Sequence, residues 1–84
     1  MRLPRDVSGT DLAKALTVFG YRTSRQSGSH LRLTTSQHGE HHITIPNHDS
    51  LRVGTLAGIL TDIAEHFDLT RDDIAMRLFG EKHR

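Results

Sequence analysis

Residues 25–33, Arg-Gln-Ser-Gly-Ser-His-Leu-Arg-Leu, decide how the middle of the chain folds. Leu31 and Leu33 alternate with His30 and Arg32, which is the period-two pattern of a half-buried strand. If the leucines face a core, His30 and Arg32 face the open side of a sheet. A histidine beside cations on such a face suits acid–base work on an anion, and an ordinary polar hairpin surface is the alternative.

Two further strands are predicted around this one, over residues 21–26 and 41–45. Ser27 and Gly28 form the turn before the strand at residues 30–35, because glycine permits a tight turn. Pro46 ends the third strand, since it has no backbone N–H to donate. The short connections predict an antiparallel meander.

Helices are predicted on both sides of the meander. The first covers residues 9–19, with Ser8 and Asp11 at capping-box spacing and Gly20 as its stop. The second covers residues 55–67, and a third, short helix ends before Gly80. One apolar set at strand and helix spacing is expected to form the core: Leu12, Leu16, Phe19, Leu31, Leu33, Ile43, Ile45, Leu56, Ile59, Leu60 and Ile63.

The predicted order α-β-β-β-α-α belongs to the α+β class, with a three-stranded antiparallel sheet and helices packed on one face. Double-stranded-RNA-binding domains share this arrangement and read RNA by shape and phosphate contacts. The chain has 84 residues, of which 35% are hydrophobic and 25% charged, so a single domain over residues 1–84 is expected.

Composition excludes several classes of protein. There is no cysteine, so disulfide frameworks and zinc knuckles are unavailable. No apolar run approaches the roughly 20 residues that span a membrane. The first residues lack the apolar core of a signal peptide. We therefore expect a cytoplasmic protein.

Charge is unevenly distributed along the chain. Residues 1–54 carry seven Lys and Arg residues against four acids, whereas residues 55–84 carry four against six. The basic part is nearly all arginine, whose planar fork can bind phosphate in a bidentate manner. An anionic partner is therefore one interpretation, and ordinary solvated charge is the other.

Taken in order, these residues resemble a HicA-type (YcfA-like) toxin, the RNA-cleaving half of a bacterial toxin–antitoxin pair. The resemblance runs from about residue 3 to residue 60, and more loosely to Phe79. It is carried by residues 3–6, 8–9, 20–21, 25–26, 28–30, 32–33, 45–46, 48 and 54–56.

The resemblance implies a double-stranded-RNA-binding-like fold, ribonuclease cleavage of mRNA, and a HicB-like antitoxin that covers the active face. It places catalysis on His30, with Gly28 and Ser29 shaping the loop. The residues expected to contact RNA are Arg22, Arg25, Gly28, Ser29, Arg32 and Arg52.

Cleavage of RNA without a metal needs a base, an acid and cations that stabilise the charge on phosphorus. Histidine titrates near pH 6.5 and can serve either proton role, and Arg25 and Arg32 could steady the phosphate. The sequence does not commit to a second catalytic group. His42, His48 and Tyr21 are its candidates.

A metal site is the alternative interpretation of His38, Glu40, His41 and His42, because histidine is a good ligand for zinc or nickel. Strand alternation argues against it, since His41 and His42 should point to opposite faces. We therefore expect neither a metal nor another cofactor.

The competing function is a non-catalytic RNA-binding module, or a degenerate toxin that only pairs with its antitoxin. The intact Gly28-Ser29-His30 motif favours the enzyme. A lysine-rich helix N-terminus would favour a binding module, but Lys14 and Lys82 are the only lysines.

Overall fold

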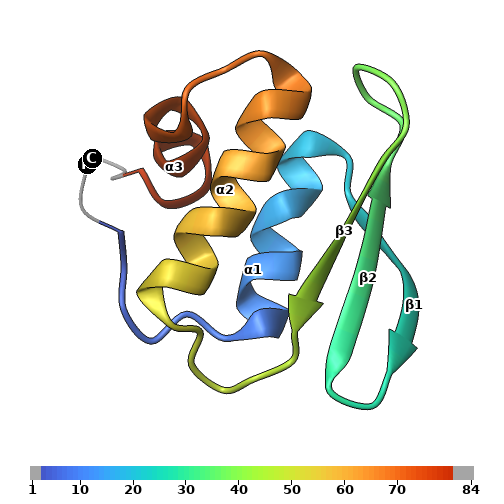
Figure 1. Cartoon of the computed structure of the whole chain (residues 1–84), viewed down its shortest axis with the longest axis vertical. Coiled ribbons are helices and arrows are strands. Elements are labelled where there is room, and N and C mark those ends of the chain that lie inside the picture. The colour runs from blue at the N-terminus through green and yellow to red at the C-terminus, as the bar shows by residue number, and fades with distance from the viewer. Residues whose placement is uncertain (1–2, 81–84) are drawn as a thin grey trace.

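The structure is a computed structural model that describes residues 3–80, and it has the element order that the sequence predicts (Figure 1). The elements are α1 (Gly9–Ala15), the 3₁₀ turn η1 (Leu16–Phe19), β1 (Arg22–Ser27), β2 (His30–Thr35), β3 (His41–Pro46), α2 (Val53–Phe67) and α3 (Arg71–Phe79). The predicted α+β class is confirmed. Within the described residues, no helix is both long and apolar enough to cross a membrane.

The sheet is antiparallel, in the order β1-β2-β3, and α1 and α2 lie on one of its faces (Figure 1). Leu31 pairs with Ile45 and Leu33 pairs with Ile43, and all four side chains are buried. The residues between them point the other way, because side chains alternate along a strand. The predicted alternation is therefore confirmed, and one face of the sheet carries no helix.

One hydrophobic cluster joins the sheet to the helices, and α3 packs against α2 and η1. Every residue predicted for the core belongs to this cluster except Ile59, which is half-buried at its margin. The cluster also includes residues that the apolar pattern did not single out: Val7, Tyr21, Leu51, Ala64, Ile74 and Ala75. Burial of each large apolar side chain stabilises the fold by about 1.5–3 kcal/mol, and this stabilisation holds the helices on the sheet.

Element boundaries differ from the predicted ones by a few residues. The first helix tightens into the 3₁₀ turn after Ala15 and ends at Gly20, whose φ of 82° is left-handed. β1 begins at Arg22 and not at Tyr21. α2 begins at Val53, two residues before the predicted start, and its N-cap residue Arg52 forms no side-chain capping hydrogen bond.

The N-termini of α1 and α3 are both capped by side chains, but the capping box predicted at Ser8 and Asp11 forms only in its Ser8 half. The Ser8 hydroxyl accepts a hydrogen bond from the Asp11 N–H at 3.0 Å. In α3 the capping box is complete, because Thr70 accepts from the Asp73 N–H at 3.0 Å and Asp73 accepts from the Thr70 N–H at 3.2 Å. The hydrogen bond from the Thr70 backbone N–H, followed by one from the Thr70 side chain, lowers the pKa of the Asp73 carboxyl group.

Candidate nucleic-acid interface

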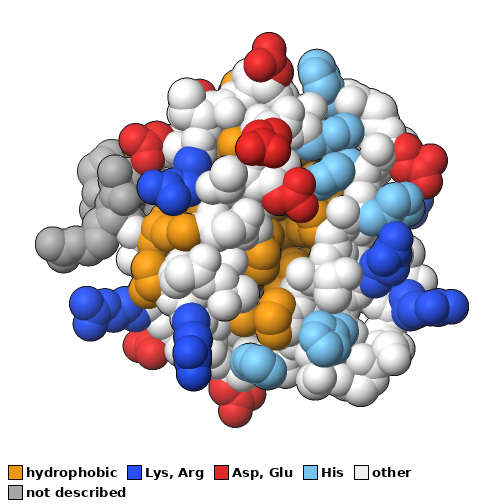
Figure 2. Space-filling model, viewed as in Figure 1, with side chains coloured by type: hydrophobic (Ala, Val, Ile, Leu, Met, Phe, Trp, Pro, Cys, Tyr) orange, Lys and Arg blue, Asp and Glu red, His pale blue; other side chains and the backbone are white. Residues whose placement is uncertain are grey.

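The helix-free side of the sheet is here called the open face. Strand pairing, and for Ser24 a hydrogen bond to Thr34, assigns these outward residues to it: Arg22, Ser24, Arg25, His30, Arg32, Thr34, His42 and Thr44. In Figure 2, Lys and Arg side chains lie at the margin of the molecule on the side of β1 and β2. The face is polar and basic, as the sequence predicts.

His30 begins β2 and is exposed, with Ser27 of β1 and Pro46 of β3 as its strand partners. The Ser29 hydroxyl lies 3.4 Å from His30 Nδ1, and no other described residue forms a hydrogen bond with the ring. Its side chain is therefore accessible to a substrate that lies on the open face.

A β-bulge explains why two arginines of β1 share this face. Residues three apart in a regular strand point to opposite faces, but the pairing shifts between Thr23 and Arg25 and leaves Ser24 extra. As a result Arg22 lies opposite Thr34 and Arg25 lies opposite Arg32. The bulge thereby adds one cation to the open face.

Arg25 and Arg32 are direct cross-strand partners, an arrangement that places two positive charges side by side. Like charges in this position destabilise a sheet by about 0.2–1 kcal/mol. Neither arginine forms an ion pair with a described residue. An anion bound between them would relieve this repulsion.

The turn before His30 is open and anchored at its base. Gly28 has a left-handed φ of 53°, and a Cβ there would meet nothing within 4 Å. The Asn47 N–H donates to the Ser29 carbonyl at 2.6 Å, and the Gly9 N–H donates to the His48 carbonyl at 2.9 Å. The segment after β3 therefore ties the hairpin to the start of α1.

The three candidates for a second catalytic group lie in different places. Tyr21 is fully buried on the helix side, so it does not share the open face with His30. His42 pairs with Thr34, four residues along β2 from His30, a separation of about 13 Å at roughly 3.3 Å per residue. His48 is exposed on the segment that is bonded to Ser29.

Arg52 is the predicted RNA contact that the fold separates from the rest. It is the N-cap of α2 and is not part of the sheet. The other predicted contacts lie on the open face or in the turn between β1 and β2. The fold therefore brings Arg25 and Arg32 near His30, Ser29 and Gly28, and it places Arg22 on the same face at the Thr34 end of the sheet.

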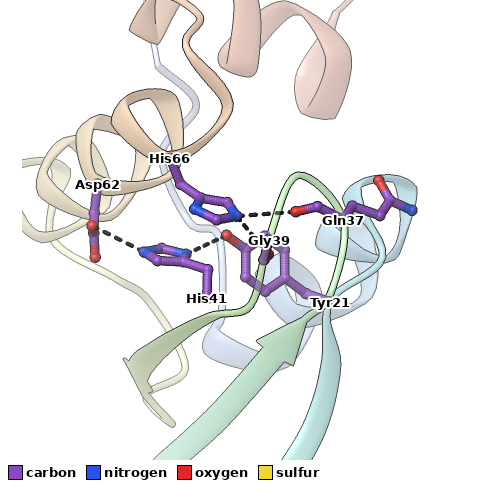
Figure 3. Close-up of polar contacts among 6 residues, drawn as sticks. All are labelled: Tyr21, Gln37, Gly39, His41, Asp62 and His66. Carbon is purple, nitrogen blue, oxygen red and sulfur yellow. Dashed lines mark hydrogen bonds and ion pairs between the residues drawn. The ribbon is translucent and has the colours of Figure 1, made fainter.

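The helix side of the sheet holds a polar network that the sequence did not predict, here called the inner histidine cluster (Tyr21, His41, Asp62 and His66; Figure 3). The Tyr21 hydroxyl lies 2.7 Å from His41 Nδ1, and His41 Nε2 lies 3.3 Å from an Asp62 carboxylate oxygen. Burial, with a smaller contribution from Asp62, raises the pKa of Tyr21. The hydroxyl therefore stays protonated and donates a hydrogen bond to His41 Nδ1.

His66 completes this cluster from α2. Its ring stacks on His41 with centroids 4.4 Å apart and planes 11° apart. Its Nε2 donates to the carbonyls of Gln37 at 3.0 Å and Gly39 at 2.9 Å (Figure 3). Asp62 and His66 are four residues apart and so share a helix face, which is the one sequence signal that could have linked them.

The residues considered for a metal site divide between the two faces. His41 points toward α2, whereas His42 points outward and pairs with Glu40 at 2.9 Å. Their predicted orientation to opposite sides is confirmed. In the part of the chain that the structure describes, no group of three or more His, Asp or Glu side chains gathers to hold a metal.

Comparison with known proteins identifies the family. A family model described as the HicA toxin of bacterial toxin–antitoxin systems matches residues 9–64, which is more than half of the 84-residue chain. The matched span includes the whole sheet and excludes α3. No curated protein and no solved structure matches the chain. The chain belongs to the HicA family and is a HicA-type toxin of a toxin–antitoxin system.

Proposed function

We propose that this toxin is a metal-independent endoribonuclease that cleaves mRNA, with His30 as its catalytic residue. Family membership supports a nuclease at the level of the family. One observation supports the residue assignment. His30 lies exposed on a helix-free sheet face that it shares with Arg25 and Arg32, an arginine pair without carboxylate partners.

The reaction uses the ribose of the substrate as nucleophile. A base removes the proton of the 2′-hydroxyl, and the resulting oxygen bonds to the adjacent phosphorus. The bond to the 5′-oxygen breaks, and that oxygen takes a proton from an acid. The products are a 2′,3′-cyclic phosphate and a 5′-hydroxyl, and His30 performs one of the two proton transfers.

Arg25 and Arg32 supply the positive charge that this step needs. Negative charge develops on the phosphoryl oxygens, and guanidinium groups donate charge-assisted hydrogen bonds to them. Arg22 adds a further phosphate contact on the same face, while Gly28 and Ser29 shape the turn at His30. Such contacts supply most of the affinity for RNA.

His48 is the candidate for the second proton transfer. It follows Pro46, the strand partner of His30, by two residues, and its neighbour Asn47 is bonded to Ser29. Tyr21 is buried on the other side of the sheet, and His42 lies too far along the strand to reach the same phosphodiester. A folded His48→Gln variant should therefore cleave RNA more slowly than the wild type.

A HicB-like antitoxin would neutralise the toxin by covering the open face. Binding to the native state alone stabilises it by about 2.7 kcal/mol when the ligand is at 100 times its Kd. The melting temperature of the toxin should therefore rise with antitoxin, and RNA should compete with it. An unchanged melting temperature at saturating antitoxin would contradict this interaction.

The test is cleavage of a labelled mRNA by purified wild type, His30→Ala and Thr44→Val, in the presence of a strong chelator. Thr44 is exposed on the same face and controls for a change of surface. Wild type and Thr44→Val should cut equally and leave cyclic phosphate ends. His30→Ala should lose at least the roughly 10²-fold that general acid–base catalysis supplies.

Other results would change the assignment. Wild-type protein that binds RNA and the antitoxin but does not cut would make this a non-catalytic RNA-binding module or a degenerate toxin. Cleavage that stops in chelator and returns with one divalent ion would contradict the metal-independent mechanism.

A further inference from the structure

A second set of polar side chains on the open face forms a continuous hydrogen-bonded chain across all three strands. Ser24 Oγ lies 3.2 Å from the Arg32 carbonyl and 3.0 Å from Thr34 Oγ1. Thr34 Oγ1 lies 2.8 Å from His42 Nδ1, and His42 Nε2 lies 2.9 Å from a Glu40 carboxylate oxygen. This hydrogen-bonded network has four contacts between neighbouring groups, and each contact needs one proton.

Counting protons shows what this chain requires of His42. The carbonyl and the carboxylate only accept, so Ser24 must donate to the Arg32 carbonyl and His42 Nε2 must donate to Glu40. Thr34 can then donate to Ser24 or to His42, but it has a single proton. Only a doubly protonated His42, which donates from Nδ1 to Thr34, satisfies all four contacts together.

Arg22 adds a fixed positive charge at this place. It lies opposite Thr34 because of the β-bulge, and it forms no ion pair with a described residue. With Glu40 negative, the local charge of Arg22, Glu40 and His42 changes from zero to one positive charge when His42 takes its second proton. The other cations on the face, Arg25 and Arg32, lie at the next position of the same face, midway between Thr34 and His30 and about 7 Å from each at roughly 3.3 Å per residue.

The surface beside this chain is hollowed. A depression of about 450 Å³ lies at this end of β1 and β2, and Arg22, Ser24 and Thr34 are among its lining residues. The guanidinium of Arg22 donates to phosphate oxygens, whereas the hydroxyl protons of Ser24 and Thr34 are already donated within the hydrogen-bonded network. Arg22 can therefore bind one backbone phosphate here, and a protonated His42, oriented by Thr34, adds a second positive charge beside it.

The position along β2 separates this place from His30. Thr34 and His30 are about 13 Å apart at roughly 3.3 Å per residue, so one phosphodiester cannot contact both. A nucleic-acid strand along the face would instead put different phosphates at the two places. A polymer with a repeated phosphate fits two separated cationic places better than a single ion does.

We propose that Arg22, Ser24, Thr34 and His42 form a second RNA-phosphate subsite on the open face, and that protonation of His42 sets its affinity. This subsite rests on the proposed function, because RNA is its ligand. It would fix the register of the RNA relative to His30 and would strengthen RNA binding below neutral pH.

The test measures RNA binding in the absence of cleavage, with protein variants that all carry His30→Ala. A dinucleotide contains one phosphodiester and can fill one subsite, whereas a longer single-stranded oligonucleotide can fill both. Affinities for both probes are measured at about pH 5.5 and pH 8, on either side of the ordinary titration range of histidine. His42→Gln and Arg22→Gln remove the subsite charges, and Thr44→Val and Arg71→Gln are matched controls outside it.

The gain in affinity from dinucleotide to oligonucleotide should be about 2–5-fold larger at the lower pH, as for an exposed charge pair. His42→Gln should abolish this pH effect. Arg22→Gln should make the slope of log affinity against log salt shallower by about 0.7, the value for one single-strand phosphate contact. Both control variants should behave like the parent.

Two results would overturn the subsite: oligonucleotide affinity that His42→Gln leaves unchanged at both pH values, or a loss confined to antitoxin binding. Failure of the proposed function would look different, because the wild-type chain would then not cut RNA. A pH-dependent gain that His42→Gln abolishes would support the subsite even in that case.

Discussion

His41 and His42 are neighbours in β3, but their rings lie on opposite sides of the sheet with opposite hydrogen-bonding requirements. His41 accepts a hydrogen bond from Tyr21 and donates one to Asp62, so its neutral form satisfies both contacts (Figure 3). His42 lies between Thr34 and Glu40 on the open face, where only its doubly protonated form completes the chain. The two neighbouring imidazoles therefore belong to networks with different donor and acceptor needs.

The same difference extends over the two faces. On the helix side, Leu31 and Leu33 are buried, and no buried side-chain polar atom of the described residues lacks a partner. On the open face, Arg25 and Arg32 face each other without a carboxylate. We conclude that the helix side provides stability, whereas the open face keeps charge that a ligand can use.

The largest difference between the faces should come from truncating adjacent residues of β2. Leu33→Ala leaves a cavity in the core and should lower the free energy of unfolding by about 2–5 kcal/mol. Arg32→Ala, on the other face, should change it by no more than about 0.5 kcal/mol. Urea unfolding of both variants measures this, and similar losses would show that the faces do not differ in this way.

Removing one hydroxyl from each side should give a smaller contrast. Tyr21→Phe takes the donor from His41 in a buried place and should destabilise the fold by about 1–3 kcal/mol. Thr34→Val removes a hydroxyl from the open face and should cost no more than about 0.5 kcal/mol. Thermal melts of the two variants measure this contrast. An equal loss of stability would show that the two hydrogen-bonded networks contribute equally to the fold.

The α3 cap tests a stabilising contact that belongs to neither face. Because the pKa of Asp73 is lowered in the native state, its stabilisation is present above the ordinary Asp pKa of about 3.9. It is lost as the pH falls through the lowered native pKa. Asp73→Ala should therefore melt below the wild type at neutral pH, and the gap should close in strong acid.

Asp11→Ala is the matched control for this cap. Asp11 occupies the same position of α1, but its carboxylate accepts no hydrogen bond from a described residue. The difference in melting temperature between the wild type and Asp11→Ala should not shrink in acid as it does for Asp73→Ala. A gap for Asp73→Ala that persists unchanged in strong acid would contradict the role of its carboxylate.

The smallest effect on stability is expected at Arg25. Arg25→Ala removes one of two facing cations, so it should leave stability unchanged or raise it by up to about 1 kcal/mol. RNA affinity should fall, with a shallower salt dependence. Arg71→Ala, on α3, is the control and should leave RNA affinity unaltered. A destabilised Arg25→Ala would show that this arginine supports the fold.

The sequence predicted the face of each β2 and β3 side chain, because alternation is local and Leu31, Leu33, Ile43 and Ile45 mark it clearly. It did not predict the bulge at Ser24, since no glycine or proline marks that position. It also missed the inner histidine cluster. Asp62 and His66 meet His41 only after α2 packs on the sheet, and such distant contacts leave no spacing in the sequence. The sequence also does not distinguish Tyr21 from the exposed candidates for a catalytic group, because its burial depends on that packing.

The most direct test of the division between the faces is the single-turnover rate at which His30→Ala cleaves a labelled mRNA, with its folded fraction measured in the same sample. We expect a rate at least about 100-fold below that of the wild type. The free energy of unfolding should stay within about 0.5 kcal/mol of the wild-type value. A folded His30→Ala chain that cleaves at the wild-type rate would contradict the catalytic role of the open face, and a chain that fails to fold would show that His30 is structural.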